Sequence, residues 1–196
     1  MKYLYILKMN FFLKLLIIIS ITFIFFSCSN VSKIDENRQW QNISDIRDKM
    51  DQLRVGDIII EEKKMTKFGS QLGHAAIVVK KGFIGDYTGT NSGYFEEDAY
   101  SWLYEDRKAM VLRYKGFDEK FKEAFEKNIK KYADRKFGPL GGRYSDTHFY
   151  CSKYVWYMFF ITAKDLGYKL DLDTNDGFLV YPYDFIESED LDQIIF

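Results

Sequence analysis

The sequence predicts an α+β fold in which helices pack on a small antiparallel sheet. A β-branched run at 75–79 and a second expected strand at 83–87 flank a Lys-Lys-Gly turn and have the pattern of a β-hairpin. Two later segments, 117–132 and 155–166, carry apolar residues at helical spacing. The chain has 196 residues, which is typical of one domain and enough to bury a core without disulfides or a metal.

The first elements of the domain are expected to be a helix, a strand and the hairpin. Apolar residues recur at steps of three and four from residue 40 onward: Trp40, Ile43, Ile46, Met50 and Leu53. Gly56 ends this helix, and residues 57–60 begin a strand. The polar segment 61–73 forms a loop that leads into the hairpin. We expect the sheet to carry its helices on one side.

The rest of the chain is expected to be mainly helical. The expected elements are, in order, a loop at 89–93, a short helix at 96–104, a strand at 110–114, a helix at 117–132, a loop at 138–142 and a helix at 155–166. Cys151 stands at or just before the first turn of the last helix, and Gly167 caps its end. In the acidic tail 170–196, a turn at 181–184 starts a short helix.

Composition and charge exclude some classes of function. Hydrophobic residues make up 47% and aromatic residues 18% of the chain, which indicates a globular rather than a disordered protein. The 28 basic and 29 acidic residues give a formal net charge of −1. The chain therefore lacks the basic excess that binding to a nucleic-acid backbone requires.

The N-terminus has the pattern of an export signal. Lysines accompany an apolar run at 15–26, which is too short to span a bilayer as a helix but suits a signal peptide. A small residue and then Cys28 follow the run. This arrangement resembles a bacterial lipoprotein signal, although Phe25 stands where leucine is usual.

The lipoprotein resemblance implies a particular domain organisation. Residues 1–27 would be the signal peptide, a lipidated Cys28 would open a tether at 28–38, and residues 39–196 would form one domain. Cys28 with its acyl chains would anchor the domain to a membrane outside the cytoplasm, in the bacterial cell envelope. An uncleaved N-terminal anchor is the alternative, and Met9 is a second candidate start.

Cys151 is the residue whose chemistry is most informative. The chain contains two cysteines, so a lipidated Cys28 leaves Cys151 without a disulfide partner. A lone thiol is either a small buried hydrophobic residue or a reactive group. A helix N-terminus favours the thiolate, and a nucleophilic thiol also needs a base such as imidazole. His74 and His148 are the two histidines, and residue spacing leaves both open as that base.

Four segments in a fixed order carry a family resemblance. They are Gly56-Asp57-Ile58-Ile59-Ile60, Gly73-His74-Ala75-Ala76-Ile77-Val78-Val79, Tyr150-Cys151-Ser152-Lys153-Tyr154-Val155-Trp156 and Tyr181-Pro182-Tyr183-Asp184-Phe185-Ile186-Glu187-Ser188. Together they resemble the permuted NlpC-like papain superfamily, in the YiiX/YaeF group, over residues 53–190. Tyr181 departs from the group, which has serine there. The resemblance implies a papain-like fold, with a small antiparallel sheet or partial barrel and packed helices.

The resemblance also implies a set of site residues. The family has its histidine before its cysteine, which makes His74 rather than His148 the base for Cys151. A third polar residue lies at the end of the following strand, where Asp86 is the matching position and Thr88 the alternative. Such a carboxylate would orient the imidazole and stabilise its charged form. Asp57 is interpreted as a turn or capping residue without a catalytic role.

The function that these expectations imply is hydrolysis of an amide through an acyl-enzyme on Cys151. A peptide or a peptidoglycan stem peptide is the expected substrate, and no metal or organic cofactor is needed. The resemblance leaves a lipid-like acyl substrate as the alternative, for a hydrolase or an acyltransferase. A rival from another class is a catalytically inactive surface lipoprotein that keeps the fold as a binding module.

Overall fold

The computed structural model describes residues 38–64, 71–89, 93–175 and 177–196. The chain divides into two units, Met1–Lys33 and Ile34–Phe196, and every described residue belongs to the second. The expected signal peptide, Cys28 and nearly all of the expected tether therefore lie outside the described residues. Among the helices of the described ranges, none combines the length and the apolar character needed to cross a membrane.

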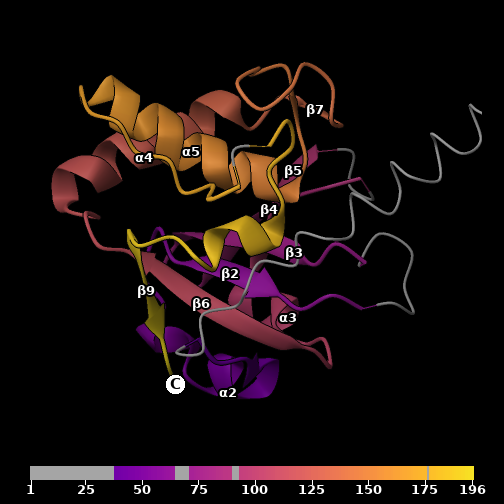
Figure 1. Cartoon of the computed structure of the whole chain (residues 1–196). Coiled ribbons are helices and arrows are strands. Elements are labelled where there is room, and N and C mark those ends of the chain that lie inside the picture. The colour runs from indigo at the N-terminus through magenta and orange to yellow at the C-terminus, as the bar shows by residue number, and fades with distance from the viewer. Residues whose placement is uncertain (1–37, 65–70, 90–92, 176) are drawn as a thin grey trace, which may run out of the picture. The chain divides into compact units, whose positions relative to one another are not determined.

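One antiparallel sheet forms the centre of the described domain (Figure 1). Its strands lie in the order β1 (Gln41–Asn42), β6 (Lys108–Tyr114), β2 (Ile58–Glu61), β3 (His74–Lys80), β4 (Phe83–Thr88) and β5 (Gly93–Asp98), and β9 (Leu191–Ile194) also pairs with β6. Every pair in this sheet is antiparallel. The expected α+β class with an antiparallel sheet is thus confirmed.

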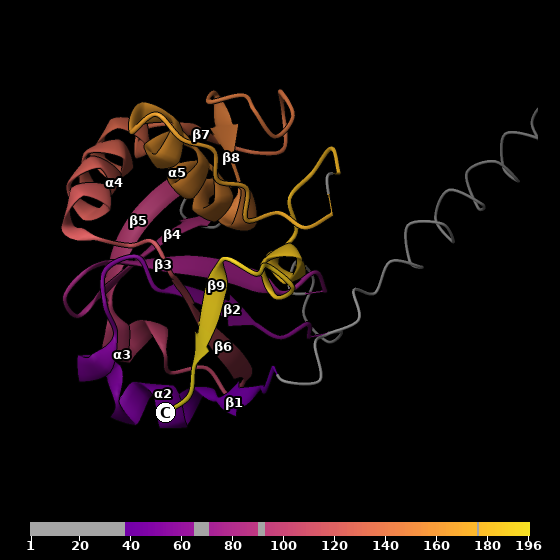
Figure 2. The ribbon, with the colours of Figure 1, turned by 60° about the vertical axis from the view of Figure 1, so that its left-hand side comes forward.

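Helices cover both faces of the sheet, whereas the sequence led us to expect helices on one side. The helices α4 (Glu119–Tyr132) and α5 (Cys151–Asp165) pack on one face, and α2 (Ile43–Asp48) and α3 (Ala99–Trp102) on the other (Figures 1 and 2). Two separate hydrophobic clusters fill the two interfaces. The one-sided expectation was wrong because two-sided burial depends on segments far apart in the chain.

The two clusters explain why the central strands are apolar at every position. Successive side chains of a strand point to opposite faces. On β3, Ala75, Ile77 and Val79 face α4 and α5, while Ala76 and Val78 face α2 and α3. A strand buried on both faces reads as a continuous apolar run rather than an alternating one.

The two long helices follow the sequence pattern closely. α4 begins after Asp118, whose carboxylate accepts a hydrogen bond from the backbone N–H of Phe121 at 2.7 Å. This N-cap satisfies one of the amides that a helix start leaves without a partner. α5 begins at Cys151 and ends at Asp165, two residues before Gly167. The sequence therefore located α4 within two residues and the end of α5 within one, and it placed Cys151 correctly at the first turn of α5.

Several shorter elements differ from the sequence-based expectation. The segment 96–104 is not one helix, because β5 runs to Asp98 and only then does α3 begin. All six residues of β5 pair with β4, and such a distant partner outweighs local helical preference. The first helix starts at Ile43 rather than at residue 40, since Gln41–Asn42 pairs with β6 as β1.

The remaining elements are short. They are the 3₁₀ helices η1 (Met50–Gln52) and η2 (Pro182–Phe185) and a small parallel pair, β7 (Lys136–Phe137) with β8 (His148–Phe149). The expected short helix near 181–184 is therefore present as η2. The tail continues into β9, which the sequence analysis did not anticipate.

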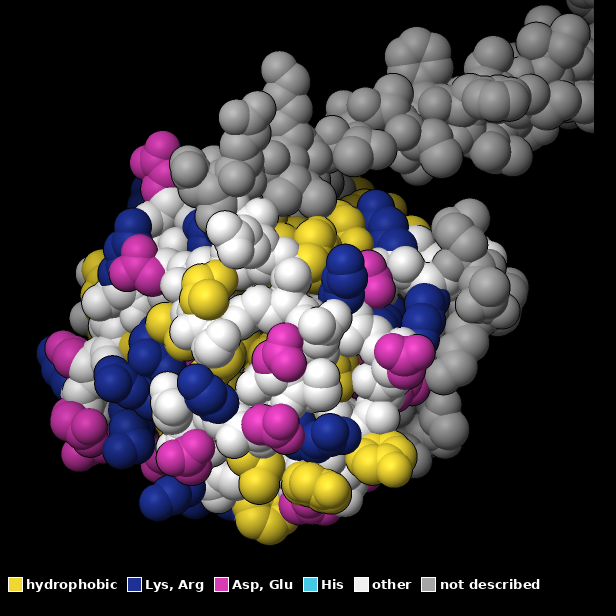
Figure 3. All heavy atoms as spheres, turned by 90° about the horizontal axis from the view of Figure 1, so that it is seen from below, with side chains coloured by type: hydrophobic (Ala, Val, Ile, Leu, Met, Phe, Trp, Pro, Cys, Tyr) yellow, Lys and Arg dark blue, Asp and Glu magenta, His cyan; other side chains and the backbone are white. Residues whose placement is uncertain are grey.

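The surface on the α2 side carries charges of both signs. Figure 3 shows Lys and Arg side chains interspersed with Asp and Glu over this face, with hydrophobic side chains at several places between them and along the lower edge. No extended basic field is visible on this face, which agrees with the formal net charge of −1.

Candidate active site

His74 and Asp86 lie on neighbouring strands and contact each other directly. His74 opens β3 and Asp86 stands near the end of β4, so the antiparallel pairing of the two strands brings them to the same end of the sheet. The Nε2 atom of His74 lies 2.7 Å from Oδ2 of Asp86. By the alternation of β3, His74 lies on the α2 and α3 face of the sheet.

The Asp86 carboxylate is buried and held by three donors. It is 3% exposed. Besides the contact with His74, its Oδ2 atom accepts a hydrogen bond from Trp102 Nε1 at 3.1 Å. Its Oδ1 atom accepts a hydrogen bond from the backbone N–H of Tyr87 at 2.6 Å. A buried carboxylate with these partners has a fixed orientation toward the imidazole.

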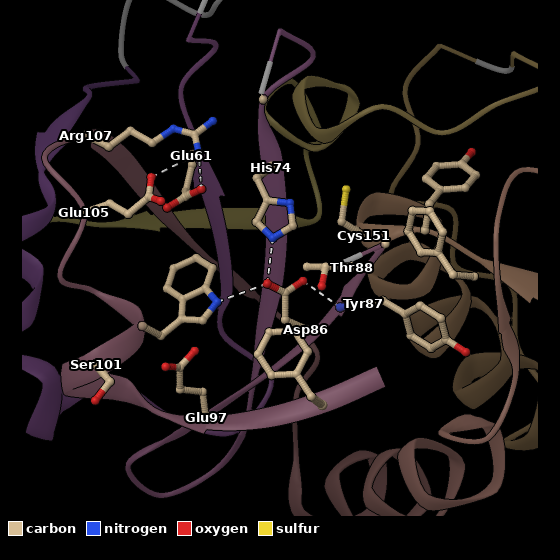
Figure 4. A pocket seen from close by; sticks show the side chains of 16 residues that line it. Glu61, His74, Asp86, Tyr87, Thr88, Glu97, Ser101, Glu105, Arg107 and Cys151 are labelled. Atoms are coloured by element: carbon tan, nitrogen blue, oxygen red, sulfur yellow. Dashed lines mark hydrogen bonds and ion pairs between the residues drawn. The ribbon is translucent and has the colours of Figure 1, made fainter. Parts of the chain in front are cut away.

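Cys151 is the first residue of α5 and carries a free thiol. α5 packs against β3, and Figure 4 shows the Cys151 sulfur beside the His74 imidazole, away from the nitrogen that meets Asp86. Its position at the start of a fifteen-residue helix places the sulfur where backbone N–H groups favour negative charge. The structure thus brings together three residues that are far apart in the sequence.

The pKa values of Cys151 and His74 shift in opposite directions. Burial alone would raise the pKa of the Cys151 thiol, but the charge of His74 and a hydrogen bond with it hold that pKa below its usual value. Burial alone would lower the pKa of His74, yet the charges of Asp86 and Cys151 and hydrogen bonds with both raise it well above its usual value. These shifts favour a thiolate next to an imidazolium.

A cavity of about 700 Å³ opens onto the three residues. Its size suits a small organic ligand or a few residues of a peptide. Aromatic side chains form much of the lining: Tyr87, Phe95, Trp102, Phe137 and Tyr150. Carboxylates and one guanidinium form the charged part: Glu61, Asp86, Glu97, Glu105 and Arg107. The cavity is therefore amphipathic, with the thiol at its surface (Figure 4).

An ion pair forms the part of the cavity wall next to His74. Glu61 lies opposite His74 in the pairing of β2 with β3, and its Oε2 atom is 2.5 Å from Nη1 of Arg107. Both side chains are buried. Burial raises the pKa of Glu61, while the charges of His74 and Arg107 oppose that rise. The pair keeps this wall polar without leaving a buried charge unpaired.

Gly73 provides the backbone conformation that leads into β3 immediately before His74. Its φ of +81° lies in the left-handed region, which side chains other than glycine rarely adopt. A Cβ atom at this position would also lie 2.9 Å from the carbonyl oxygen of Glu61 and 3.0 Å from the ring of Tyr183. The glycine therefore sets the position of the histidine that follows it.

Three hydrogen bonds hold the start of α5, two of them with the tail. The Ser152 hydroxyl donates to the carbonyl oxygen of Val180 at 2.8 Å, and the N–H of Val180 donates to the Tyr150 hydroxyl at 3.0 Å. The buried Lys153 ammonium donates to the carbonyl oxygen of His148 at 2.7 Å. These three contacts surround Cys151 in the sequence and fix the position of its backbone.

The other residues considered from the sequence lie elsewhere. The ring of His148 contacts the Thr147 hydroxyl at 3.0 Å and is not part of the cavity lining. Thr88 lines the cavity, but it is Asp86 that meets the His74 imidazole. Asp57 is fully buried and forms an ion pair with Arg113 at 2.7 Å, which agrees with its structural interpretation.

Trp102 is a site residue whose contact the sequence analysis missed. Trp102 lines the cavity. Its indole N–H also donates to Asp86, and its ring stacks on His74 with the centroids 6.1 Å apart. Its partner lies 16 positions away on another element, so no local pattern signals the contact.

Comparison with solved structures identifies a protein with a similar fold. The crystal structure of the metalloprotein yiiX from Escherichia coli O157:H7, a DUF1105 protein, matches with a TM-score of 0.57 and 15% sequence identity. The match covers 74% of this chain and 97% of yiiX. At this identity the likeness establishes a YiiX-like fold and nothing further. The sequence matches no family model, and no curated protein matches it significantly.

Proposed function

We propose that this protein is a papain-like cysteine hydrolase that cleaves an amide bond through an acyl-enzyme on Cys151. The observation that carries the proposal is the arrangement around His74, with the Asp86 carboxylate at one ring nitrogen and the Cys151 thiol on the other side of the ring. A nucleophile, a base and a group that orients the base are the elements of covalent acyl transfer.

In the first half of the proposed reaction, the thiolate attacks. His74 holds the proton of the Cys151 thiol, and the sulfur forms a bond to the substrate carbonyl carbon. The negative charge that develops on the carbonyl oxygen is stabilised by the backbone N–H at the start of α5. When the carbon–nitrogen bond breaks, the leaving amine takes the proton from His74, and a thioester remains on Cys151.

In the second half, water releases the acyl group. His74, now neutral, takes a proton from a water molecule that attacks the thioester carbonyl. The carbon–sulfur bond breaks, the carboxylic acid leaves, and the thiolate–imidazolium pair is restored. Throughout, Asp86 keeps the imidazole in place and stabilises its charged form.

The metalloprotein yiiX raises the question of a metal at this site. In the ranges that the structure describes, no group of three or more His, Cys, Asp or Glu side chains is arranged to hold a metal ion. The side chains at the site are already paired, Asp86 with His74 and Trp102, and Glu61 with Arg107. The described residues therefore do not fit a metal centre, and the proposed reaction has no step through one.

The proposed substrate is the amide of a peptide, with a peptidoglycan stem peptide as the leading candidate. This choice rests on the resemblance to the NlpC-like superfamily and on the proposed attachment to a membrane of the cell envelope through Cys28. The cavity of about 700 Å³ can accept a short peptide, and the Glu97 carboxylate in its wall offers an acceptor for backbone N–H groups.

A lipid-like acyl substrate is the second candidate. Five aromatic side chains line the cavity, among them Phe95 and Phe137, and they provide an apolar surface for an acyl chain. The covalent steps would be the same, with an ester or N-acyl carbonyl as the target. Transfer of the acyl group to an acceptor other than water would make the protein an acyltransferase.

Product analysis of the purified full-length protein tests the proposal. The protein is incubated with peptidoglycan fragments and, separately, with N-acyl amino acids, and products are identified by mass spectrometry. We expect products with the wild type and with His148→Ala, and none with Cys151→Ala or His74→Ala. His148→Ala is the matched control, because it removes the histidine outside the cavity.

Two results would count against the proposal. Equal product from the wild type and from Cys151→Ala would show that the thiol is not the nucleophile. Binding of a substrate without any turnover or covalent adduct on Cys151 would favour the non-catalytic binding module.

A further inference from the structure

Trp102 makes two contacts with the residues that orient the proposed base. Its Nε1–H donates to Oδ2 of Asp86 at 3.1 Å, and the same oxygen lies 2.7 Å from Nε2 of His74. Its ring also stacks on the His74 ring, with the two planes inclined by 25°. One side chain thus donates to the carboxylate and lies beside the imidazole, with the two ring planes nearly parallel.

We propose that Trp102 is a positioning residue for the His74–Cys151 pair and that it acts through Asp86. This inference rests on the proposed cysteine chemistry and adds a residue to it. Trp102 touches neither sulfur nor the reacting carbonyl in this role. It fixes the carboxylate, and the carboxylate in turn holds the imidazole that stabilises the thiolate.

A hydrogen-bond donor on each oxygen fixes the orientation of the Asp86 carboxylate plane. Oδ1 of Asp86 receives the backbone N–H of Tyr87 at 2.6 Å. Without Trp102, Oδ2 would keep only the His74 contact, which is the contact to be oriented. A terminal carboxylate torsion is soft, so a second donor on Oδ2 restricts its rotation.

The Trp102 ring also lowers the local polarity around this contact. Trp102 and Asp86 are 9% and 3% exposed, and the indole contacts both partners, so it limits the access of water to the His74–Asp86 contact from its side. An interaction between opposite charges is stronger in such an environment than in contact with solvent. Removing the ring would weaken the support that Asp86 gives to the imidazolium.

Trp102 is itself well fixed, although its helix is short. The Asp98 carboxylate caps α3 by accepting the N–H of Ser101 at 3.0 Å. Ala99 and Leu103, on either side of the indole in the sequence, are buried in the cluster between the sheet and α2. The core on this face of the sheet therefore determines where the indole N–H points.

The test is the pH profile of Cys151 alkylation by iodoacetamide, followed on the Cys151 peptide by mass spectrometry. Trp102→Phe keeps an aromatic ring and removes the N–H. We expect the acid limb of the profile to move to higher pH, with alkylation in that limb slowed by about fivefold, as the loss of one typical intramolecular hydrogen bond implies. Asp86→Asn should move the limb in the same direction and further.

A double variant and a matched control make the test specific. If Trp102 acts through Asp86, Trp102→Phe should add nothing in the Asp86→Asn background. Trp156→Phe is the control, because Trp156 is also buried and donates its N–H to a carboxylate, Asp171, at 2.7 Å outside the cavity. It should leave the profile of the wild type unchanged.

The outcomes separate this inference from the proposed function. A wild-type thiol that reacts only at alkaline pH would overturn the proposed cysteine chemistry and the inference with it. A wild-type thiol that reacts at low pH, with a Trp102→Phe profile that is unchanged or moved to lower pH, would overturn the role of Trp102 alone. An additive effect of the two substitutions would also overturn action through Asp86.

Discussion

The Nε2 atom of His74 lies 2.7 Å from Oδ2 of Asp86, on two strands that are paired in one antiparallel sheet. The contact uses one ring nitrogen and leaves the other side of the imidazole to Cys151 (Figure 4). It also raises the pKa of His74.

The first prediction concerns the protonation of His74. The charge of Asp86 helps to raise the pKa of His74 against the effect of burial, so His74 should remain protonated well above pH 6.5. Asp86→Asn removes that charge and should lower the pKa of His74. The chain has two histidines, so NMR of the protein labelled in histidine gives two ring signals to titrate.

The second histidine provides the internal control for that titration. His148 contacts Thr147 outside the cavity, and its signal should be the same in the wild type and in Asp86→Asn. His148→Ala assigns the two signals. An unchanged pKa of His74 in Asp86→Asn would show that the carboxylate does not stabilise the imidazolium.

The second prediction concerns Gly73, which precedes the histidine. Gly73→Ala introduces a Cβ in a left-handed conformation and 2.9 Å from the Glu61 carbonyl oxygen. We expect a loss of stability of about 1–3 kcal/mol and slower alkylation of Cys151 in the molecules that remain folded, because His74 must move. Thermal unfolding and alkylation rates measure the two effects.

Gly82→Ala is the matched control for this substitution. Gly82 has a φ of +76°, yet nothing lies within 4 Å of the place where its Cβ would be. Gly82→Ala should lose stability through the backbone strain, but its Cys151 should be alkylated as fast as in the wild type. Equal loss of thiol reactivity in both variants would mean that Gly73 does not position His74.

The third prediction concerns Lys153, which is buried two residues after Cys151. Burial lowers the pKa of Lys153 from 10.5 to about 8. Between these two pH values the unfolded chain binds more protons at this position than the folded chain, so the stability of the fold rises with pH. Lys153→Met keeps the unbranched side chain, and its stability should lack this increase.

Urea unfolding at several pH values between 8 and 10 measures this difference. The wild type should gain free energy of unfolding relative to Lys153→Met as the pH rises. Parallel curves for the two proteins would show that Lys153 keeps an ordinary pKa in the folded state.

The fourth prediction separates stability from chemistry at Asp57. Both carboxylate oxygens of Asp57 meet the Arg113 guanidinium, at 2.7 and 2.8 Å, and the side chain is fully buried. Asp57→Ala should lower the free energy of unfolding by about 3 kcal/mol, because it leaves the partner charge without its counterion. The pH profile of Cys151 alkylation in the folded protein should not change.

An exposed ion pair offers the comparison for Asp57. Asp192 lies 3.5 Å from the Lys115 ammonium at the surface, where solvent screens the attraction. Asp192→Ala should leave the denaturation midpoint nearly unchanged. A changed alkylation profile in Asp57→Ala would instead assign this residue to the site.

The sequence was sufficient for the elements whose pattern is local. The helical spacing at 117–132 and 155–166 located α4 and α5, and the β-branched run at 75–79 located β3. The position of Cys151 at the start of α5 also followed from the sequence. In each case the residues that define the element are close together in the chain.

The elements that the sequence did not reveal depend on distant partners. β5 carries three acidic residues and looked helical in part, but it pairs with β4 along its whole length. β9 pairs with β6 from the far end of the chain. The three consecutive isoleucines of β2, Ile58, Ile59 and Ile60, are all fully buried. Such a continuous apolar run indicates a strand that is covered on both faces, and it could have predicted helices on both sides of the sheet.

In the candidate site too, the sequence identified individual residues, whereas the contacts between them depend on distant partners. Residue chemistry singled out Cys151 and the two histidines, and the choice between Asp86 and Thr88 required the register of β3 with β4. The contact of Trp102 with Asp86 depends on where α3 packs, which the sequence does not encode locally.

The central claim is that Cys151 is a thiolate activated by His74, and the rate of its alkylation by iodoacetamide as a function of pH tests it most directly. The wild type should react well below pH 8, His74→Ala should react slowly until the pH nears the ordinary thiol pKa, and His148→Ala should match the wild type. A thiol that stays unreactive until the protein unfolds, or a His74→Ala profile identical to that of the wild type, would contradict the account.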